Sequence, residues 1–567
     1  MIGVLADNIY SPLGSTSEQN YSAVKSGATG LRTADAFGLG QPITASLFPD
    51  GQVDADFDAI TADCDMTKFE KMLVISITDA LSRCQVDASS PRTLFVISST
   101  KGNVDLIDRP GFDSSLAASA EKIARHFGNP NTPVVVSNAC ISGVNAQIVA
   151  MRLLQSGQYD HAIVAGADAQ SRFIVSGFLS FKALSPDECR PFDADRIGLN
   201  LGEAAATIIY SARPLADGWN LAAGAVRNDA NHISGPSRTG EGCYRALQTI
   251  TQGVDPEEIA LVNVHGTATP YNDEMESIAL DRAGLASRPV NALKGYFGHT
   301  MGAAGILETI MSMHSLADGT ILGTRGFGST GTTRTVNIDA ANRPASGSAF
   351  IKMLSGFGGC NAAILMRHGA PTESFVSGAC ARATSHTVKI TPDGAWVDGE
   401  PLLTTATGAD LITELYRAYV KDYPKYFKMD PLSRLGFVAS ELLLQKCPEA
   451  EADDSRAIIL ANRTASLCND LCYQATISDD NYFPSPALFV YTLPNIVTGE
   501  IAIRNKYYGE TTFYVLPSVD EAQIKSLVEA SMQDPATRSA IAGWLECPSA
   551  DDFLAELTLY EKSTNPA

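Results

Sequence analysis

The sequence lacks several features that mark membrane, secreted or nucleic-acid-binding proteins. No stretch of about 18 uninterrupted apolar residues occurs, so no segment is predicted to cross a bilayer. The N-terminal MIGVLADNIYSPLG has no basic residue and predicts a strand and turn rather than a signal peptide. Basic residues are outnumbered, 42 Lys and Arg against 63 Asp and Glu, and the net charge is −21. This acidity argues against nucleic acid and membranes as partners.

Cysteines are present but show no paired pattern. The 11 cysteines are scattered, and the closest two, Cys468 and Cys472, have no second pair or nearby histidine to complete a zinc site. This usage predicts reduced thiols, a cytoplasmic protein and no metal.

The remaining composition is that of a folded protein of several domains. The 567 residues are 45% hydrophobic and 19% charged, which suits two to four domains with proper cores. Apolar runs bounded by turn residues alternate with helical patterns over the first 370 residues. Strands are predicted at Thr93–Ser98, Pro133–Ser137, Ala162–Ala165, Ala205–Tyr210 and Ala260–Val264, and a helix at Gly143–Gln155. Gly157 suits the left-handed position just past that helix. This alternation predicts α/β layers with parallel crossovers.

The last part of the chain is predicted to be a separate domain that repeats an earlier one. A connector rich in small and polar residues follows Arg367. Beyond it, PLSRLGFVASELLL, SRAIILANRTAS and SPALFVYTLPNIVTGEIAIR repeat the order of elements around Cys140. This match predicts a strand at ALFVYTL and places Ile496 where Cys140 stands in the first copy.

Cys140 is the first candidate for chemistry. It lies in SNACISG, between a β-branched strand and the predicted helix. A thiol at a helix N-terminus faces unpaired N–H groups and the positive end of the helix dipole, which favour the nucleophilic thiolate. Most buried cysteines are small hydrophobic residues, so position alone leaves both interpretations open.

Two of the eight histidines occupy comparable positions. His265 ends ALVNV and opens HGTATPYNDEMES, and His299 lies in LKGYFGHTMGAAGILE. Either histidine alone suits a structural role, but a cysteine with two histidines can supply a nucleophile and two hydrogen-bond donors. The glycine-rich SGFGGCNA at 355–362 allows a tight turn or a close approach to a ligand. Neither a G-x-x-x-x-G-K-[ST] loop nor a G-x-S-x-G elbow is present.

Together these segments resemble the β-ketoacyl-acyl carrier protein synthases, the condensing enzymes of fatty acid and polyketide assembly. The resemblance covers about residues 1–369 and rests on SPLG, NACISG, VAGADAQ, RPFDADRIGLNLGEAAA, HGTATPYNDEMES, KGYFGHTMGAAG and SGFGGCNAA in that order. It implies a thiolase-like α/β fold, two similar halves in a layered αβαβα arrangement, usually dimeric.

The resemblance also implies roles for individual residues. Cys140 matches the acylated nucleophile. His265 and His299 match the histidines that help decarboxylate the malonyl unit and stabilise the enolate. Lys294 matches the active-site lysine, and Glu308 the acidic residue of the following helix.

The glycine-rich and threonine-containing loops match substrate-binding parts. Phe357 matches a gating phenylalanine whose backbone N–H joins that of Cys140 in an oxyanion hole. Thr267 and Thr269 match the pair that contacts the phosphopantetheine arm, and Gly358 joins this substrate-binding set. Departures occur at MLSGFGGCN for the usual NSFGFGGTN, HGTAT for HGTGT, and Lys-Gly for Lys-Ser. They leave the Cys-His-His set intact and affect pocket shape and chain preference.

The implied reaction is a decarboxylative Claisen condensation of an acyl thioester with malonyl-acyl carrier protein. It implies no bound cofactor, since the carrier's phosphopantetheine holds the substrates, and it implies acyl carrier protein as partner, with a homodimer or ketosynthase heterodimer. Two alternatives remain open: a thiolase-type acyltransferase with Cys360 as a second cysteine, and a non-catalytic partner that determines chain length.

The predicted domains are 1–217 with the nucleophile, 218–369 with both histidines, and 370–567. The last resembles truncated ketosynthase-like and chain-length-factor proteins. It has no histidine after His386, so it is predicted to be a catalytically silent half-ketosynthase domain.

Overall fold

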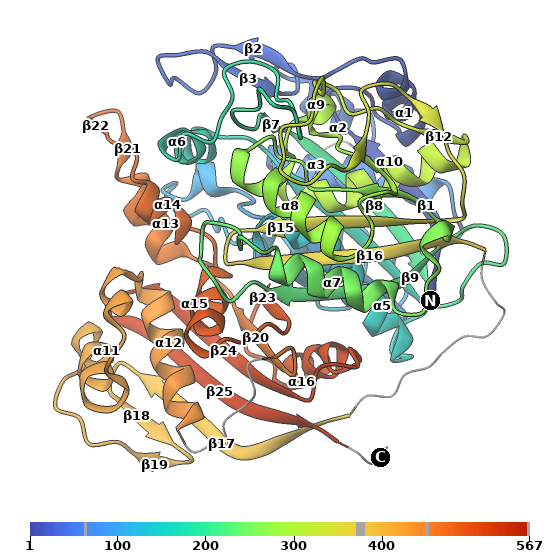
Figure 1. Cartoon of the computed structure of the whole chain (residues 1–567). Coiled ribbons are helices and arrows are strands. Elements are labelled where there is room, and N and C mark those ends of the chain that lie inside the picture. The colour runs from blue at the N-terminus through green and yellow to red at the C-terminus, as the bar shows by residue number, and fades with distance from the viewer. Residues whose placement is uncertain (62–64, 370–379, 446, 448–452, 564–567) are drawn as a thin grey trace.

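The computed structural model describes residues 1–61, 65–369, 380–445, 447 and 453–563. Three parts of the chain, whose course is drawn in Figure 1, each contain a set of five paired strands, to which the second and third parts add short strands. In the first, the strand order is β5 (Val134–Val136), β4 (Thr93–Ser98), β6 (His161–Asp168), β8 (Ala204–Ser211) and β1 (Ile2–Tyr10). The first three strands run parallel, and the pairings of β8 with β6 and β1 are antiparallel.

The second sheet repeats this topology. Its order is β11 (Pro289–Asn291), β10 (Ile259–Asn263), β15 (Ala349–Gly356), β16 (Cys360–His368) and β9 (Trp219–Asn228), with β13 (Asn337–Ile338) added beside β11. Again the first three strands are parallel, and the pairings of β16 are antiparallel. The strands expected from the apolar runs of the first 370 residues are therefore confirmed.

The third sheet belongs to residues 380–563, called here the C-terminal unit. Its order is β23 (Thr511–Val515), β20 (Arg456–Asn462), β24 (Ser539–Ser549), β25 (Asp552–Lys562) and β17 (Ala381–Thr391), extended by β18 (Gly394–Val397) and β19 (Glu400–Pro401). Numbered by position in the chain, all three sheets have the order 3-2-4-5-1. The C-terminal unit therefore has the sheet of one half of the preceding fold.

Helices form the layers between and outside the first two sheets. Helices α5 (Ser142–Gln155) and α10 (Ala304–Ala317) lie in the core cluster that contains strands of both sheets. Helices α3 (Lys68–Ser82) and α4 (Leu116–His126) cover the outer face of the first sheet, and α7 (Glu241–Thr251) and α8 (Pro270–Arg282) that of the second. This is the expected αβαβα arrangement. Both central strands β4 and β6 are almost wholly buried, as strands covered on both faces require.

The shorter elements surround these layers. They are α1 (Ser17–Lys25), α2 (Gln52–Asp58), α6 (Arg172–Ser180), α9 (Lys294–Phe297), β2 (Arg32–Ala34), β3 (Ile43–Ser46), β7 (Leu201–Gly202), β12 (Thr320–Ile321) and β14 (Arg343–Pro344). In the part of the chain that the structure describes, no helix has the length and apolar character to cross a bilayer.

The helices of the C-terminal unit correct one expectation from the sequence. They are α11 (Ala409–Leu415), α12 (Pro431–Leu444), α13 (Leu467–Gln474), α14 (Pro486–Val490), α15 (Ile496–Asn505) and α16 (Glu521–Ser531), with a small hairpin of β21 (Ile477–Ser478) and β22 (Asn481–Tyr482). The strand predicted at ALFVYTL is wrong, because this segment forms α14 and a turn.

Placing Ile496 opposite Cys140 is also wrong. Cys140 follows the third strand of its sheet, whereas Ile496 begins a helix that precedes the third strand of the C-terminal unit. The loop that corresponds to Cys140 by topology connects β23 to α16, and it reads LPSVD at 516–520. It contains no cysteine.

The C-terminal unit continues the first sheet. Strand β23 pairs antiparallel with β5, with Tyr514 opposite Val136 and Val515 opposite Val135, and Figure 1 shows the orange-to-red unit against the rest of the chain. Buried ion pairs cross this boundary. Arg152 of α5 lies 2.6 Å from Glu510, and Arg227 of β9 lies 2.7 Å from Asp534. The exposed edge that β5 would otherwise present is thus occupied by the chain itself.

Candidate active site

Cys140 lies in a strained turn between β5 and α5. Its neighbour Ala139 has φ +50°, a left-handed conformation that costs energy for a residue with a side chain. Ser142 holds the turn, because its hydroxyl accepts the N–H of Asn138 at 2.8 Å and donates to the carbonyl of Ala139 at 2.6 Å. The turn presents the thiol at the N-terminal end of a 14-residue helix.

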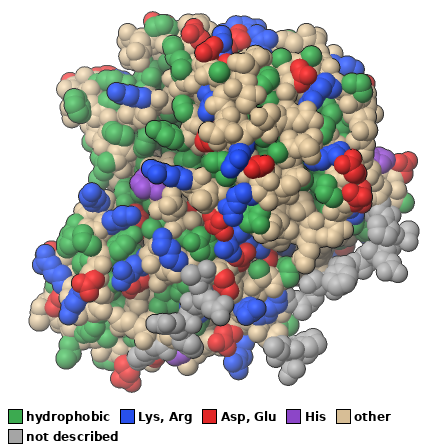
Figure 2. Space-filling model, in the orientation of Figure 1, with side chains coloured by type: hydrophobic (Ala, Val, Ile, Leu, Met, Phe, Trp, Pro, Cys, Tyr) green, Lys and Arg blue, Asp and Glu red, His purple; other side chains and the backbone are tan. Residues whose placement is uncertain are grey.

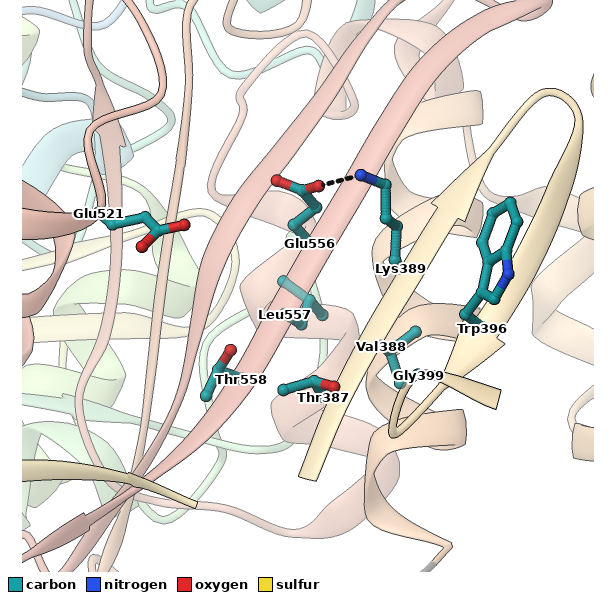
Figure 3. A pocket seen from close by; sticks show the side chains of 9 residues that line it. All are labelled: Thr387, Val388, Lys389, Trp396, Gly399, Glu521, Glu556, Leu557 and Thr558. Carbon is teal, nitrogen blue, oxygen red and sulfur yellow. Dashed lines mark ion pairs between the residues drawn. The ribbon is translucent and has the colours of Figure 1, made fainter. Parts of the chain in front are cut away.

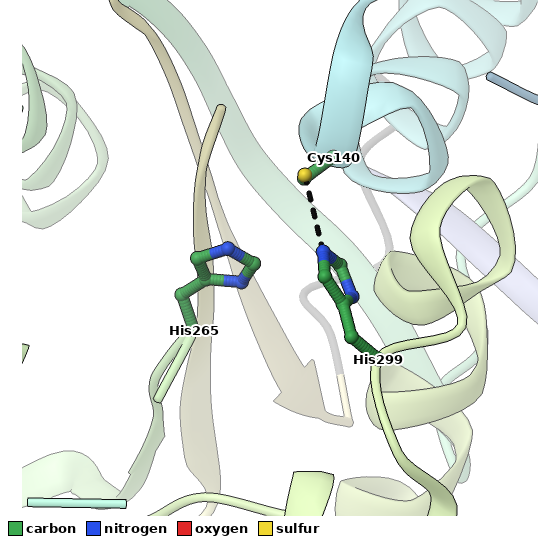
Figure 4. A group of neighbouring side chains, drawn as sticks. All are labelled: Cys140, His265 and His299. Carbon is green, nitrogen blue, oxygen red and sulfur yellow. Dashed lines mark hydrogen bonds between the residues drawn. The ribbon is translucent and has the colours of Figure 1, made fainter. Parts of the chain in front are cut away.

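The two predicted histidines converge on this thiol. His299 Nε2 lies 3.1 Å from Cys140 Sγ, and the two imidazole rings meet edge to face with centroids 5.1 Å apart. Figure 4 shows both rings on the same side of the thiol, carried by separate loops. Cys140, His265 and His299, separated by up to 159 positions, thus form one cluster. The thiol sulfur and one ring nitrogen of each histidine lie within 4.8 Å of one another.

Glycine at position 298 allows the loop of His299 to approach its neighbour. Gly298 has φ +67°, and a Cβ there would lie 2.3 Å from the carbonyl oxygen of Leu201. A side chain at this position would push the histidine loop away from the thiol.

Hydrogen bonding assigns the tautomer of His299. The backbone N–H of Met301 donates to Nδ1 at 3.3 Å, so in the neutral ring the proton belongs on Nε2, which faces Cys140. Nδ1 of His265 is buried and has no hydrogen-bond partner among the described residues. The site therefore offers neutral N–H donors to a negatively charged atom, and one buried ring nitrogen remains available to a ligand.

Burial and nearby positive charge keep both histidines neutral. Burial lowers the pKa of His265 well below its usual range, and Lys294, His299 and Lys352 lower it further. The pKa of His299 is also well below its usual range because of burial and the charges of both lysines. Burial raises the pKa of the Cys140 thiol to about 12, against an opposing effect of Lys294. The expected stabilisation of the free thiolate is therefore outweighed by desolvation.

These shifts predict how the rings titrate. We expect the NMR resonances of His265 and His299 to keep neutral-imidazole positions between about pH 7.5 and 5.5, although unperturbed histidine titrates near 6.5. Resonances would be assigned by His265→Gln and His299→Gln variants. Because the pKa of each histidine is lower in the folded state than in the unfolded state, the free energy of unfolding should decrease as the pH falls below about 6.5. A midpoint near 6.5 in either ring would contradict this prediction.

Lys294 and Glu308 lie behind the histidines. Lys294 Nζ donates to the carbonyl of His265 at 2.6 Å and to Glu308 Oε1 at 2.9 Å. Lys352 of β15 pairs with the other oxygen of Glu308. Burial opposes ionisation of Glu308, but the two lysines hold its pKa below the usual range. Lys352 was not predicted, although a lysine within the apolar AFIKML is a signal that could have identified it.

The remaining predicted residues lie in two connections, Phe357 and Gly358 in the turn between β15 and β16, and Thr267 and Thr269 in the loop that follows His265. Phe357 is half-buried, and its ring stacks at a tilt against Phe181 with centroids 5.6 Å apart. Gly358 has φ +88° and donates its N–H to the carbonyl of Ile233 at 2.6 Å. The hydroxyl oxygens of Thr267 and Thr269 lie 2.9 Å apart; Thr267 is buried and Thr269 is half-buried.

Acidic residues of α8 hold the loop that carries these threonines. Glu276 accepts the N–H groups of His265 and Gly266 at 2.6 and 2.8 Å, and Asp273 accepts that of Ala268 at 3.2 Å. The pattern HGTATPYNDEMES therefore encodes both the histidine and the carboxylates that fix its backbone.

The cluster is poorly suited to a metal ion. A thiol with two imidazoles is a possible ligand set for a soft cation, but two buried lysines beside the rings disfavour an additional positive charge there. A groove of about 500 Å³ lies on the C-terminal unit between β17, β18 and β25 (Figure 3). Its lining includes the Lys389–Glu556 ion pair at 2.6 Å and none of the predicted site residues.

Two family models match the chain. Residues 2–213 match the N-terminal domain of beta-ketoacyl synthase, and residues 220–328 match its C-terminal domain. A curated relative, 3-oxoacyl-[acyl-carrier-protein] synthase 2 of Rhizobium meliloti (strain 1021), is 32% identical over 278 residues, which are 46% of this chain and 65% of the relative. The Staphylococcus aureus protein of the same name is 34% identical over 209 residues, 34% of this chain and 51% of the relative. The alignments thus span between half and two thirds of these relatives.

Solved structures share the fold. The PfaC keto synthase-chain length factor has a TM-score of 0.77 at 14% identity, covering 99% of this chain and 78% of that chain. The ishigamide ketosynthase/chain length factor has a TM-score of 0.58 at 24% identity, covering 65% of this chain and 99% of that chain. The first likeness extends through the C-terminal unit.

Proposed function

Because this chain belongs to the beta-ketoacyl synthase family, we propose that it condenses an acyl thioester with a malonyl thioester by decarboxylation. The observation that carries the proposal is the Cys140–His299 contact of 3.1 Å beside a second neutral histidine. The reaction needs a nucleophile that holds the acyl group and donors that stabilise an enolate. These three side chains supply both.

The first half-reaction loads the acyl group. Cys140 Sγ attacks the carbonyl carbon of the acyl thioester, a new C–S bond forms, and the bond to the carrier's sulfur breaks. The proton lost by Cys140 goes to the departing thiolate. We assign the backbone N–H groups of Cys140 and Phe357 to the oxyanion of this step. With a pKa near 12 in the free site, Cys140 is expected to lose its proton as it attacks.

The second half-reaction forms the carbon–carbon bond. The malonyl C–C bond to the carboxylate breaks, CO₂ leaves, and the electron pair forms an enolate whose oxygen accepts N–H bonds from His265 and His299. The enolate carbon attacks the Cys140 thioester, and the C–S bond breaks. The Cys140 thiolate then takes one proton from solvent, which balances the step because the malonyl carboxylate leaves as neutral CO₂. Lys294 positions His265 through its carbonyl, and Glu308 balances the lysine charge. The chemistry needs no cofactor bound by the chain.

The thiolase alternative is less well supported by the geometry. A thiolase requires a second cysteine that exchanges protons at the reacting carbon. The Cys360 thiol instead donates to the carbonyls of Phe357 at 3.2 Å and Asn138 at 3.7 Å, so it is engaged by the backbone of the two turns.

We propose an acyl carrier protein as partner in a cytoplasmic setting, with Thr267, Thr269 and Gly358 contacting the arm. Figure 2 shows Lys and Arg side chains gathered over the C-terminal unit around α11 and α12. Exposed basic residues there, none of which forms an ion pair within the described residues, are Arg417, Lys421, Lys425 and Lys428. Burial and the charge of Lys425 lower the pKa of His232. The next residue, Ile233, accepts the N–H of Gly358. An acidic carrier protein has a charge complementary to this basic surface.

We also propose the division into 1–217, 218–369 and a non-condensing 370–567. The last part lacks histidine after His386 and has no cysteine in the loop after β23. A homodimer or ketosynthase heterodimer remains a prediction. Since β23 occupies the edge of β5, a second chain would have to bind another surface.

Intact-mass analysis after incubation with a panel of acyl-carrier thioesters tests the proposed function. We expect one acyl group per chain, mapped by peptide sequencing to Cys140. Loading on another residue, or no loading by any thioester that the panel contains, would overturn the proposal.

The histidines are expected to act mainly on the malonyl half-reaction. His299→Ala should lower malonyl decarboxylation by about 10²–10³, the loss that follows removal of one oxyanion donor. Acylation of Cys140 should decrease less. Rapid-quench measurement of CO₂ release and of acyl-enzyme formation separates the two steps, and equal losses in both would contradict this division of roles.

A further inference from the structure

The turn that carries Phe357 is held by the C-terminal unit. Asn495, the residue before α15, donates from Nδ2 to the carbonyl oxygen of Phe357 at 2.8 Å. The same nitrogen lies 3.7 Å from Cys360 Sγ. The side chain therefore reaches across 138 positions of sequence to a turn of the proposed active site.

The contact leaves little freedom for either partner. A Cβ on Gly358 would lie 2.6 Å from Asn495 Nδ2, and a Cβ on Gly499 would lie 2.5 Å from the carbonyl oxygen of Gly358. Only glycine at both positions lets the start of α15 and the turn approach so closely. A displacement of α15 would consequently displace the turn.

The orientation of the amide of Asn495 is set by its partner. The carbonyl of Phe357 accepts only, so the NH₂ group must face it, and exchanging the two amide atoms would oppose two oxygens. Asn495 is fully buried, and its Oδ1 has no hydrogen-bond partner among the described residues. Burying this polar side chain costs free energy that one hydrogen bond offsets only in part. The cost suggests that a defined position of the turn is needed.

The opposite turn of the site is held by the same unit. Asn138, two residues before Cys140, donates from its amide to the carbonyl of Thr511 in β23 at 2.8 Å. The N–H groups of Cys140 and Phe357 thus lie on two turns that are both bonded to the C-terminal unit. Their separation depends on where that unit is seated.

We propose that Asn495 is a positioning residue that sets the Phe357 backbone, and with it the oxyanion hole, from the C-terminal unit. This inference rests on the proposed function, because it assumes that the Phe357 N–H serves acyl transfer to Cys140. Under this proposal the C-terminal unit, which contributes no catalytic group, directly influences the acylation of Cys140. Decarboxylation is assigned to His265 and His299, and within the described part of the chain Asn495 forms no hydrogen bond with either histidine loop.

The test uses full-length variants that alter only this donor. Asn495→Ala removes the hydrogen bond, and Asn495→Asp places a second acceptor opposite the Phe357 carbonyl. We expect acylation of Cys140 to slow about tenfold in the alanine variant and further in the aspartate variant, within the range for a misplaced catalytic group. Malonyl decarboxylation should stay within about twofold of the wild type, because the histidine donors are unchanged.

A matched control is available in the same unit. Asn469 is also buried and donates from Nδ2 to the carbonyl of Leu488 at 2.8 Å, and among the described residues its side chain forms no hydrogen bond with the Phe357 turn. Asn469→Ala should leave both half-reactions at the wild-type rate. Unchanged acylation in both Asn495 variants, or equal losses in acylation and decarboxylation, would overturn the proposal. Failure of the wild type to load Cys140 would instead overturn the proposed function itself.

Discussion

We expect the Cys140→Ala variant to lose condensation completely, to the level of the uncatalysed reaction, and to acquire no acyl mass. The reason is that alanine cannot form a thioester, and no other thiol among the described residues lies within hydrogen-bonding distance of either imidazole. Removing a nucleophile costs about 10⁴-fold or more in enzymes where a set of groups acts as a unit. Intact-mass analysis and product formation under saturating thioester measure the two losses.

Cys243→Ala provides the control for this variant. Cys243 is equally a cysteine with a raised pKa, but it is buried in the core between α7 and the second sheet. Its replacement should leave loading on Cys140 unchanged. Acyl mass on the Cys140→Ala protein would show that the nucleophile lies elsewhere.

Residual decarboxylation in Cys140→Ala would add information about the histidines. Their donors stabilise an enolate whether or not an acyl group is present, and His299 keeps its tautomer through Met301 rather than through the thiol. We therefore expect the variant to retain measurable release of CO₂ from a malonyl thioester while condensation is lost.

The residues of the Cys140–His265–His299 cluster could be identified from the sequence because each lies in a short local motif, and the family resemblance implies that these motifs meet. An apolar strand followed by a helix identifies the turn of Cys140, and the glycine-flanked segments of His265 and His299 have the composition of loops at strand ends. The alternation of strands and helices predicts α/β layers, and the αβαβα order of those layers is implied by the family resemblance. The sequence pattern does not give the distances between these side chains. Only the structure shows that His299 Nε2, rather than Nδ1, faces the Cys140 thiol.

The errors in the C-terminal unit have an identifiable cause. SPALFVY is apolar enough for a strand, but Ser485 caps the helix and Pro486 occupies its first turn, which is a helix-start signal. The sequence match then paired α15, which precedes strand β23, with α5, which follows strand β5. This pairing placed Ile496 opposite Cys140. Asn495 escaped prediction for another reason, since its partner Phe357 is 138 positions away.

Removing residues 370–567 should have the largest effect on the fold. Strand β5 would lose its partner β23, and an unpaired edge promotes aggregation. Phe178 of α6 would lose Phe489, whose ring centroid is 5.5 Å away, and Phe173 would lose Tyr473 at 4.7 Å. We expect the 1–369 fragment to be largely insoluble, or to bind a hydrophobic dye strongly if it remains in solution.

The ion pairs across the boundary allow the same dependence to be tested without truncation. Glu510→Gln leaves the C-terminal unit in place but removes the carboxylate that lies 2.6 Å from Arg152, where both side chains are at most 3% exposed. Breaking such a buried pair costs about 3–5 kcal/mol, measured by urea denaturation. Asp160→Asn, which breaks an exposed pair with Arg92, should cost under about 1 kcal/mol.

These two experiments decide what the C-terminal unit does for residues 1–369. Soluble material from the 1–369 fragment should keep Cys140 but make products of altered chain length at a lower rate, because both turns of the site lose their contacts with Asn495 and Thr511. A soluble fragment with the products and rate of the full chain would show an independent appendage. Loss of solubility together with a destabilised Glu510→Gln protein would show that residues 1–369 depend on the C-terminal unit for a stable fold.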